Sequence, residues 1–376
     1  MIPCQKHLFN IPEDITYLNC AYLSPQLRSV SEAGHTGVAA KEQPWQIIAQ
    51  DFFIQTEQTR RLFAEMIDAQ PDDIAIIPAV SYGIAVAALN IKLSAGDAIL
   101  ILEDQFPSNV YSWREAAKET GAIVKTVSRP EEEDWTRALL DHIDENTAVV
   151  AVPNCHWTDG GLIDLVKIAH RCRKMGAALV VDATQSIGAL PFSVAEVQPD
   201  FLVTASYKWL FGPYSLGFLY VHPRYQDGKP LEHGWIARKN SEDFAGLVNY
   251  QNEFQPGARR FDVGERSNFA LMPMVLAALQ QILDWQVTEI GATLSAMTNR
   301  IAERAAELGL KVSPAHLRGP HLMGLRFPEG VPADLVERLL QNKIYVSVRG
   351  HSIRISPHLY NTPNDIDKFL ETLASG

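Results

Sequence analysis

Two polar side chains stand at the ends of strand-like segments, where they could act together on a small molecule. Asp182 closes the apolar run 177–181, and Lys208 follows the strand-like segment 200–205 after two residues. Open α/β sheets bind ligands at the carboxyl ends of their strands. A carboxylate facing a pyridinium nitrogen, with a lysine amine nearby, is what pyridoxal phosphate chemistry requires. The lysine forms a Schiff base, and the carboxylate keeps the ring nitrogen protonated. We therefore expect pyridoxal 5'-phosphate as the cofactor.

The residues around Lys208 form an apolar setting that is unsuited to a solvated charge. Tyr207 precedes the lysine, and the segment 209–211 (Trp-Leu-Phe) follows it. Burial lowers the pKa of a lysine, which supplies the neutral amine that attacks an aldehyde. The same amine can then act as base and acid at the substrate carbon. We expect Lys208 to be catalytic, against the alternative of an ordinary surface lysine.

Strand-like and helix-like segments alternate between residues 70 and 222, and these segments must position both side chains. Apolar runs occupy 74–78, 98–102, 122–127, 147–152, 179–181, 200–205 and 216–221, with helical patterns at 83–90 and 112–118. Continuous apolar runs are typical of strands buried on both faces. Strands separated by helices indicate a parallel or mostly parallel sheet. The predicted fold class is therefore α/β.

The pattern changes near residue 265. Helical patterns cover 272–285 and 292–308, and short strands are expected at 323–327, 344–348 and 353–356. A last helix is signalled by Thr362, Pro363 and Asp365, which suit the N-cap, the first and the third helical positions. These elements predict a smaller α+β domain. We assign residues 15–260 to a large cofactor-binding domain, and residues 1–14 and 261–376 to the small domain.

The composition excludes several classes of protein. The 376 residues are 47% hydrophobic and 20% charged, as in a protein with a large core, and the net charge of −11 disfavours nucleic acid or an anionic membrane as partner. The four cysteines, Cys4, Cys20, Cys155 and Cys172, lack metal-ligand spacing and suit a reduced cytoplasmic protein. No signal peptide is visible, and no apolar run approaches the roughly 20 residues that a bilayer span needs. We expect a cytoplasmic enzyme without a metal.

Four segments together resemble the class V aminotransferase family of fold-type I pyridoxal phosphate enzymes. They are 182–185 (Asp-Ala-Thr-Gln), 206–208 (Ser-Tyr-Lys), 106–109 (Phe-Pro-Ser-Asn) and 354–361 (Arg-Ile-Ser-Pro-His-Leu-Tyr-Asn). The resemblance covers essentially the whole chain. It implies a large domain with a mostly parallel sheet flanked by helices, a smaller C-terminal α+β domain, and a homodimer with its site near the interface. The family also contains cysteine desulfurases, selenocysteine lyases, kynureninases and isopenicillin N epimerase.

The resemblance assigns several residues to the cofactor ring. It makes Asp182 the partner of the ring nitrogen, while Gln185 and Asn154 could reach the ring hydroxyl oxygen. Phe106 matches the aromatic side chain that stacks on the ring, which contributes about 1 kcal/mol beyond burial. The alternatives are that Asp182 caps a strand-to-helix turn, that Gln185 is a solvated helix residue, and that Phe106 is a core residue.

Other matching positions concern the cofactor phosphate. Anions bind at helix N-termini, and Val80 and Ser81 lie between a strand and a helix, as in the family's phosphate cup. Tyr207 matches a phosphate contact of kynureninase-like members. Trp235 resembles a tryptophan that reaches the partner's phosphate, and Ser267 could replace the family's threonine in a segment with the same role. The alternatives are that Ser81 only caps the helix, that Trp235 is a core residue, and that Ser267 lies in a loop without such a role.

The remaining expectations concern the substrate. Arg354 resembles the arginine that clamps the substrate α-carboxylate, because a guanidinium binds a carboxylate through two parallel hydrogen bonds. A surface salt-bridge arginine is the alternative. His156, Trp157 and His351 could line the substrate pocket.

The expected activity is amino transfer on an amino acid through the Lys208 Schiff base. A β-lyase of the selenocysteine lyase or kynureninase type is the alternative, since it would use the same substrate carbanion but expel a β-substituent. The segment 341–353 contains no cysteine, so persulfide transfer by the usual desulfurase route is not expected. A dinucleotide-binding oxidoreductase is disfavoured, because no Gly-x-Gly-x-x-Gly opens a helix after a strand. A noncatalytic protein on this scaffold would not need Lys208, Asp182 and Arg354.

Overall fold

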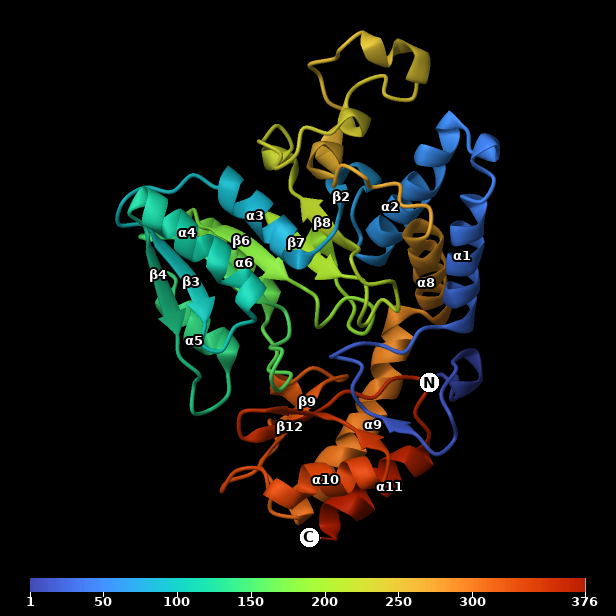
Figure 1. Ribbon diagram of the computed structural model, residues 1–376. Coiled ribbons are helices and arrows are strands. Elements are labelled where there is room, and N and C mark those ends of the chain that lie inside the picture. The colour runs from blue at the N-terminus through green and yellow to red at the C-terminus, as the bar shows by residue number, and fades with distance from the viewer. Residues whose placement is uncertain (376) are drawn as a thin grey trace.

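The structure, a computed structural model, describes residues 1–375 and places a seven-stranded sheet within the larger of two units (Figure 1). Its strands are β2 (Ile74–Ile77), β3 (Ala98–Leu102), β4 (Ile123–Val127), β5 (Thr147–Pro153), β6 (Ala178–Asp182), β7 (Phe201–Ala205) and β8 (Gly217–Val221). They lie in the order β2-β8-β7-β6-β5-β3-β4, and only β8 runs antiparallel to its neighbours. The mostly parallel sheet predicted from the sequence is confirmed.

Helices cover both faces of this sheet, as its apolar strands require. They are α1 (Arg28–Ala40), α2 (Ile54–Met66), α3 (Val80–Asn90), α4 (Tyr111–Thr120), α5 (Trp135–His142), α6 (Leu165–Met175) and α7 (Val194–Val197). Alternate residues of β5 face opposite ways: Val149 packs with the buried residues of α3 and α4, and Val150 with those of α5 and α6.

The sequence predicts that β4 is buried on both faces, and the structure shows that this prediction is wrong. Ile123 is half exposed, and only Val127 of this strand is buried, because β4 lies at the edge of the sheet.

The smaller unit is built around the C-terminal elements and lies at the bottom of Figure 1. Its elements are β9 (Met323–Arg326), α10 (Ala333–Gln341), β10 (Ile344–Tyr345), β11 (Ser347–Arg349), β12 (Ser352–Ile355) and α11 (Pro363–Ala374). The strand expected at 344–348 is two short strands: β10 pairs with β1 (Thr16–Tyr17), and β11 with β12. Thr362 caps α11 as predicted, since its hydroxyl accepts from the Asp365 amide at 3.1 Å.

Two helices connect the units. Helix α8 (Leu271–Trp285) lies against α1 and α2, and the long α9 (Val287–Glu307) runs from there to the smaller unit (Figure 1). The domain boundaries at residues 14/15 and 260/261 stay a prediction, and residue 376 lies outside the described residues.

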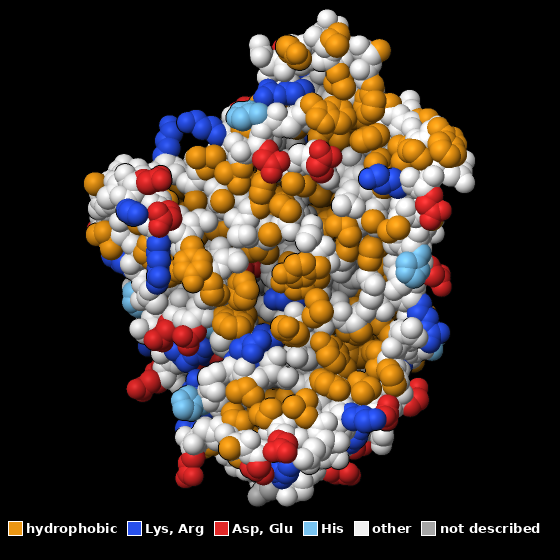
Figure 2. Space-filling view, viewed as in Figure 1, with side chains coloured by type: hydrophobic (Ala, Val, Ile, Leu, Met, Phe, Trp, Pro, Cys, Tyr) orange, Lys and Arg blue, Asp and Glu red, His pale blue; other side chains and the backbone are white. Residues whose placement is uncertain are grey.

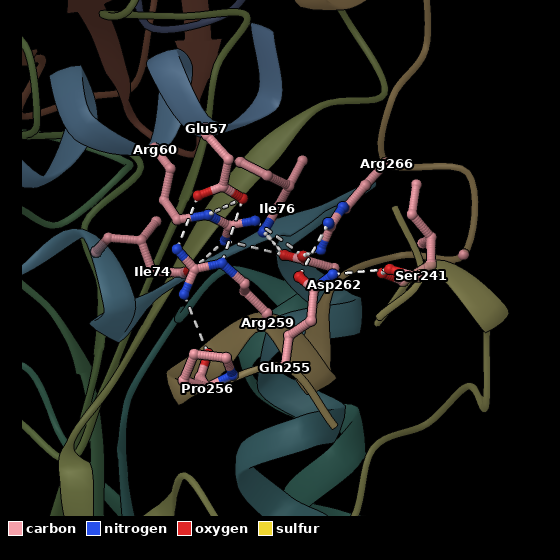
Figure 3. A network of polar contacts seen from close by, with 12 residues as sticks. Glu57, Arg60, Ile74, Ile76, Ser241, Gln255, Pro256, Arg259, Asp262 and Arg266 are labelled. Carbon is pink, nitrogen blue, oxygen red and sulfur yellow. Dashed lines mark hydrogen bonds and ion pairs between the residues drawn. The ribbon is translucent and has the colours of Figure 1, made fainter. Parts of the chain in front are cut away.

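A buried ionic network ties the large unit together beside the end of β2 (Figure 3). The Asp262 carboxylate accepts from Arg60 Nη2 at 2.9 Å, from the Ile76 amide at 2.6 Å, and from Arg266. All three charged side chains are fully buried. Glu57 extends the network outward, since it bonds Arg259 at 2.7 Å. The network holds α2, β2 and the segment 262–266 in fixed relative positions.

Replacing Asp262 by asparagine should destabilise the fold by about 3–5 kcal/mol, because two buried guanidinium groups lose their shared carboxylate. The measurement is the urea midpoint of unfolding. Asp227→Asn is the matched control: Asp227 pairs with Arg260 at 3.0 Å, but its side chain is fully exposed, so its replacement should leave the midpoint nearly unchanged. Equal shifts of the two midpoints would contradict the role given to Asp262.

Candidate active site

A cavity of about 280 Å³ opens at the carboxyl ends of the central strands. Its walls come from the connections that follow β2, β3, β5 and β6, each of which leads to a helix, and from the connection between β7 and β8. The contributing segments are residues 78–81, 105–109, 153–157, 182–185, 205–208 and 214–216. Figure 2 shows hydrophobic side chains gathered over the middle of this face, around a hollow in which basic side chains appear. The cavity lies where an open α/β sheet binds its ligand.

Lys208 lies in the wall of this cavity, just beyond β7. It is 6% exposed, and its amine lies 5.4 Å from the ring centroid of Phe106. Burial lowers the pKa of Lys208 to about 8, the nearby Asp182 carboxylate raises it, and the Arg354 charge lowers it further. Within residues 1–375 the amine forms no ion pair. A substantial share of the amine is therefore neutral near pH 8 and can act as a nucleophile and base.

Asp182 ends β6 on the same side of the sheet. Its carboxylate oxygen Oδ1 accepts from the Thr184 amide at 3.0 Å. Burial raises the pKa of Asp182, whereas the Thr184 hydrogen bonds and the Lys208 charge lower it. The described residues give this carboxylate no ion pair, so it is available to a protonated ring nitrogen and fits the expected cofactor.

The two amide side chains expected at the ring hydroxyl are placed differently. Gln185 lines the cavity, and its orientation is fixed because Nε2 donates to Ala21 O at 3.1 Å and Oε1 accepts from Trp209 Nε1 at 2.9 Å. The other amide, Asn154, is outside the lining of the cavity, and its Nδ2 donates to Ile163 O at 3.3 Å. The structure thus brings Gln185, but not Asn154, into the cavity wall.

The N-terminus of α3 forms another part of the wall. Val80 and Ser81 are its first two residues, and both line the cavity. The first amides of a helix have no intrahelical acceptor, so they can donate to a phosphate. Gly83 allows this placement: a Cβ there would lie 2.5 Å from Val203 of β7. Only glycine lets α3 approach the strand so closely.

Aromatic side chains enclose the remaining space. Phe106 lies with its ring 5.5 Å from that of Trp157, in edge-to-face contact. Tyr207 lies with its ring 4.6 Å from that of Tyr214, and all four residues line the cavity. Phe106 and Tyr207 therefore lie in the cavity wall, and their contacts with a cofactor stay predictions.

Trp235 and Ser267 lie away from this cavity. Trp235 belongs to a short 3₁₀ helix, Trp235–Ala237, and its ring packs 5.4 Å from that of Phe244. The segments of Trp235 and Ser267 do meet, since a Cβ on Gly234 would lie 3.3 Å from Gly264 Cα. Neither residue lines the cavity of its own chain.

Arg354 lies on β12 of the smaller unit, directly behind Trp157. Its Nη1 donates to the Trp157 carbonyl oxygen at 2.8 Å, and the residue is 1% exposed. Its buried Nε finds no partner in the described chain. Burial and the Arg349 charge lower the pKa of Arg354 to about 9. The negative charge of a bound anion would favour the charged guanidinium and so offset both the burial and the repulsion from Arg349.

Of the three other candidates for the substrate pocket, only Trp157 lines this cavity. His156 is fully buried against the Trp135 ring at 5.3 Å, and His351 lines a neighbouring cavity. The sequence analysis missed Gln105 and Tyr214, which also line the cavity. Gln105 directly precedes Phe106, which is a usable signal, whereas Tyr214 reaches the site through an irregular loop that has no recognisable motif.

The rate at which the apoprotein takes up pyridoxal phosphate should rise with pH below about 8 and level off above it. The reason is that Lys208 reacts as the neutral amine, which is the major form above its pKa of about 8. The measurement is the initial rate of appearance of visible absorbance across the pH range. A midpoint near the ordinary lysine pKa of 10.5 would show that Lys208 is not perturbed.

Across residues 1–375, no group of three or more histidine, cysteine or acidic side chains is placed to hold a metal ion. Of the helices in the same range, none is both long and apolar enough to span a bilayer.

The chain resembles known proteins over nearly its whole length. A family model described as Aminotransferase class-V matches residues 45–369. An uncharacterized aminotransferase, YcbU of Bacillus subtilis, is 28% identical over 85% of this chain and 83% of its own. A probable cysteine desulfurase of Pyrococcus abyssi is 25% identical over 84% and 82%. Isopenicillin N epimerase of Streptomyces clavuligerus is 23% identical over 84% and 83%.

Solved structures share the fold. The apo structure of cysteine desulfurase from Thermococcus onnurineus superposes with a TM-score of 0.85, at 19% identity over 99% of this chain and 98% of that one. A variant of C-DES with glycine linked to its pyridoxal phosphate gives a TM-score of 0.88, at 21% identity over 99% of both chains. These superpositions show that the large and small units together have the architecture of fold-type I enzymes.

Proposed function

This chain belongs to the class V aminotransferase family and is a pyridoxal-phosphate-dependent enzyme of amino acids, and from this premise we propose that its reaction is amino transfer. The observation that carries the proposal is the meeting of Lys208, Asp182 and Arg354 around one cavity and its rear wall. When bound, pyridoxal phosphate withdraws electrons from the substrate Cα. The roles below describe what this chain's own side chains contribute.

We propose that one group of residues holds the cofactor. Lys208 would bind it covalently through Nζ, and Asp182 would hold a negative charge opposite the ring nitrogen. The α3 amides at Val80 and Ser81, with the Ser81 and Tyr207 hydroxyls, would bind the phosphate. Two further side chains would complete the contacts: Phe106 by covering the ring, and Gln185 by reaching the ring hydroxyl, whereas Asn154 would have to turn away from the Ile163 carbonyl to do so.

Two side chains, the Arg354 cation and the neutral Lys208 amine, would control the reacting atoms of the substrate. Arg354 would bind the substrate α-carboxylate, which fixes the direction of the Cα–H bond. Lys208 Nζ would accept the proton from Cα, a task that suits a pKa of about 8. The aromatic side chains Phe106, Trp157 and Tyr214 would exclude water from the cavity.

The test follows the visible spectrum of the cofactor-loaded protein while pools of L-amino acids are added without an oxo acid. Stoichiometric loss of absorbance, restored by an oxo acid, is expected for amino transfer. Persistent absorbance with continuous release of ammonia, alanine or sulfide would overturn the proposal in favour of a β-lyase of the kynureninase or selenocysteine lyase type.

We also propose a homodimer with the site near its interface. Large apolar side chains of two segments are exposed: Trp45 before α2, and Val248 and Tyr250 after Trp235 are 77–92% exposed. In Figure 1 the yellow segment that carries Val248 and Tyr250 projects from the top of the large unit. A second copy would cover this surface and could receive Trp235 and Ser267 at its own phosphate site. Light scattering should give twice the 41.8 kDa mass of one chain, and a monomer would contradict the proposal.

The cytoplasm is the compartment we propose. All four cysteines are unpaired thiols in the described chain, and three of them are buried.

A further inference from the structure

Two arginines lie on one face of the hairpin formed by β11 and β12. The register pairs Ser347 with Arg354 and Arg349 with Ser352. Residues 347 and 349 face the same way, so Arg349 and Arg354 are diagonal neighbours, roughly 7–8 Å apart at Cα. A two-residue turn joins the strands, with Gly350 at φ 54°. The hairpin therefore holds two guanidinium groups side by side on a rigid support.

Both guanidinium groups contact Trp157. Arg354 donates to the tryptophan carbonyl at 2.8 Å, and the Arg349 Cζ atom lies 5.3 Å from the centroid of the indole ring. Trp157 lines the central cavity and also a second cavity of about 740 Å³, whose wall includes Arg349. Arg354 thus lies behind the wall of the central cavity, and Arg349 lies in the wall of the second cavity, against the Trp157 ring that both cavities share.

The charge of Arg349 is not balanced by the protein. No acidic side chain within residues 1–375 forms an ion pair with Arg349 or Arg354. Its Nη1 donates only to the neighbouring Val348 carbonyl at 2.7 Å, and its buried Nε has no partner in the described chain. Arg129, in the wall of the same second cavity, differs because Asp159 pairs with it at 2.5 Å.

The thiol and hydroxyl groups nearest to Arg354 are also unable to neutralise its charge. Burial strongly raises the pKa of the Cys20 and Cys155 thiols and of the Tyr17 hydroxyl, so all three are neutral. The α-carboxylate of a substrate brings one negative charge, which Arg354 would bind. That charge leaves Arg349 free for a second anionic group.

We propose that Arg349 binds a second carboxylate of the substrate, so that the enzyme acts on amino acids whose side chain ends in a carboxylate. This inference rests on the proposed function, which supplies the amino acid and its α-carboxylate. The substrate would place its α-carboxylate on Arg354 and extend its side chain past Trp157 toward Arg349. The indole ring would separate the two anionic groups and select the chain length between them.

The test uses unreactive probes, so that it is independent of catalysis. Succinate and glutarate are titrated calorimetrically into the cofactor-loaded protein, beside butyrate as a monocarboxylate of similar length. We expect one dicarboxylate to bind about 10- to 100-fold more tightly than butyrate. In Arg349→Gln this advantage should disappear while butyrate binding is kept, because only the second carboxylate loses its partner.

Lys311→Gln is the matched control, because Lys311 lines the second cavity but is exposed. It should retain the preference for the dicarboxylate. Equal loss of butyrate and dicarboxylate binding in Arg349→Gln would overturn the inference, since Arg349 would then share the α-carboxylate. An unchanged preference would overturn it as well. The two proposals can fail separately. If the dicarboxylate preference depends on Arg349 but the protein fails the amino transfer test, amino transfer is rejected and the recognition of two carboxylates is retained.

Discussion

Replacing Lys208 by alanine should abolish both the visible absorbance of the bound cofactor and the turnover of amino acids. The amine is the nucleophile that attaches the cofactor and the base at Cα, so two functions are lost together. Loss of the proton transfer alone costs about 10²–10⁴-fold in rate. The measurements are the absorbance spectrum after gel filtration and the rate with the best amino acid pool.

The control for this variant is Lys118→Ala. Its side chain is 78% exposed and pairs with Glu115 at only 3.7 Å, so its removal should change neither the spectrum nor the rate. Reductive trapping with borohydride, followed by peptide mass spectrometry, gives a second readout: the cofactor mass should fall on the peptide that contains Lys208. A yellow, active Lys208→Ala protein would refute the assignment.

The position of the site could be predicted because its key residues follow buried strands. Asp182 and Lys208 come from the ends of β6 and β7, which are neighbours in a parallel sheet, so strand order alone brings them to one edge. Val80 and Ser81 come from the N-terminus of α3, directly after β2. Such residues are fixed by local pattern and by the common direction of the strands.

The rest of the site depends on contacts that no local pattern encodes. Arg349 was not singled out, because its significance lies in the register between β11 and β12 and in the indole ring of Trp157. Asn154 follows a buried strand just as Asp182 does, yet its amide turns to the Ile163 carbonyl. The direction of a side chain after a strand depends on the loop that follows, and tertiary packing decides it.

The prediction that β4 is buried on both faces was wrong for a related reason. Lys125 and Thr126 interrupt its apolar run, and its place at the edge of the sheet leaves Ile123 half exposed. Strand order is a property of the whole sheet, and a single apolar run does not reveal it.

Replacing Arg354 by alanine should raise the KM for amino acids at least about 30-fold while the bound cofactor stays in place. The guanidinium is buried and lies behind the wall of the cavity, so a substrate carboxylate there would lose a desolvated, charge-assisted partner, which costs about 2–5 kcal/mol. The cofactor contacts lie on other elements, chiefly β6, β7 and α3, and should be unaffected. The measurements are steady-state kinetics and the absorbance spectrum.

Two comparisons make this prediction about Arg354 specific. Arg354→Lys keeps the charge but not the paired hydrogen bonds, so its KM should lie between those of the native protein and Arg354→Ala. A primary amine without a carboxylate should react equally slowly with all three proteins, because it never uses Arg354. If the amine also reacts more slowly in Arg354→Ala, the loss comes from displacement of Trp157, whose carbonyl Arg354 holds at 2.8 Å. An unaltered KM for the amino acid would remove Arg354 from the site, because a carboxylate bound elsewhere would not sense its loss.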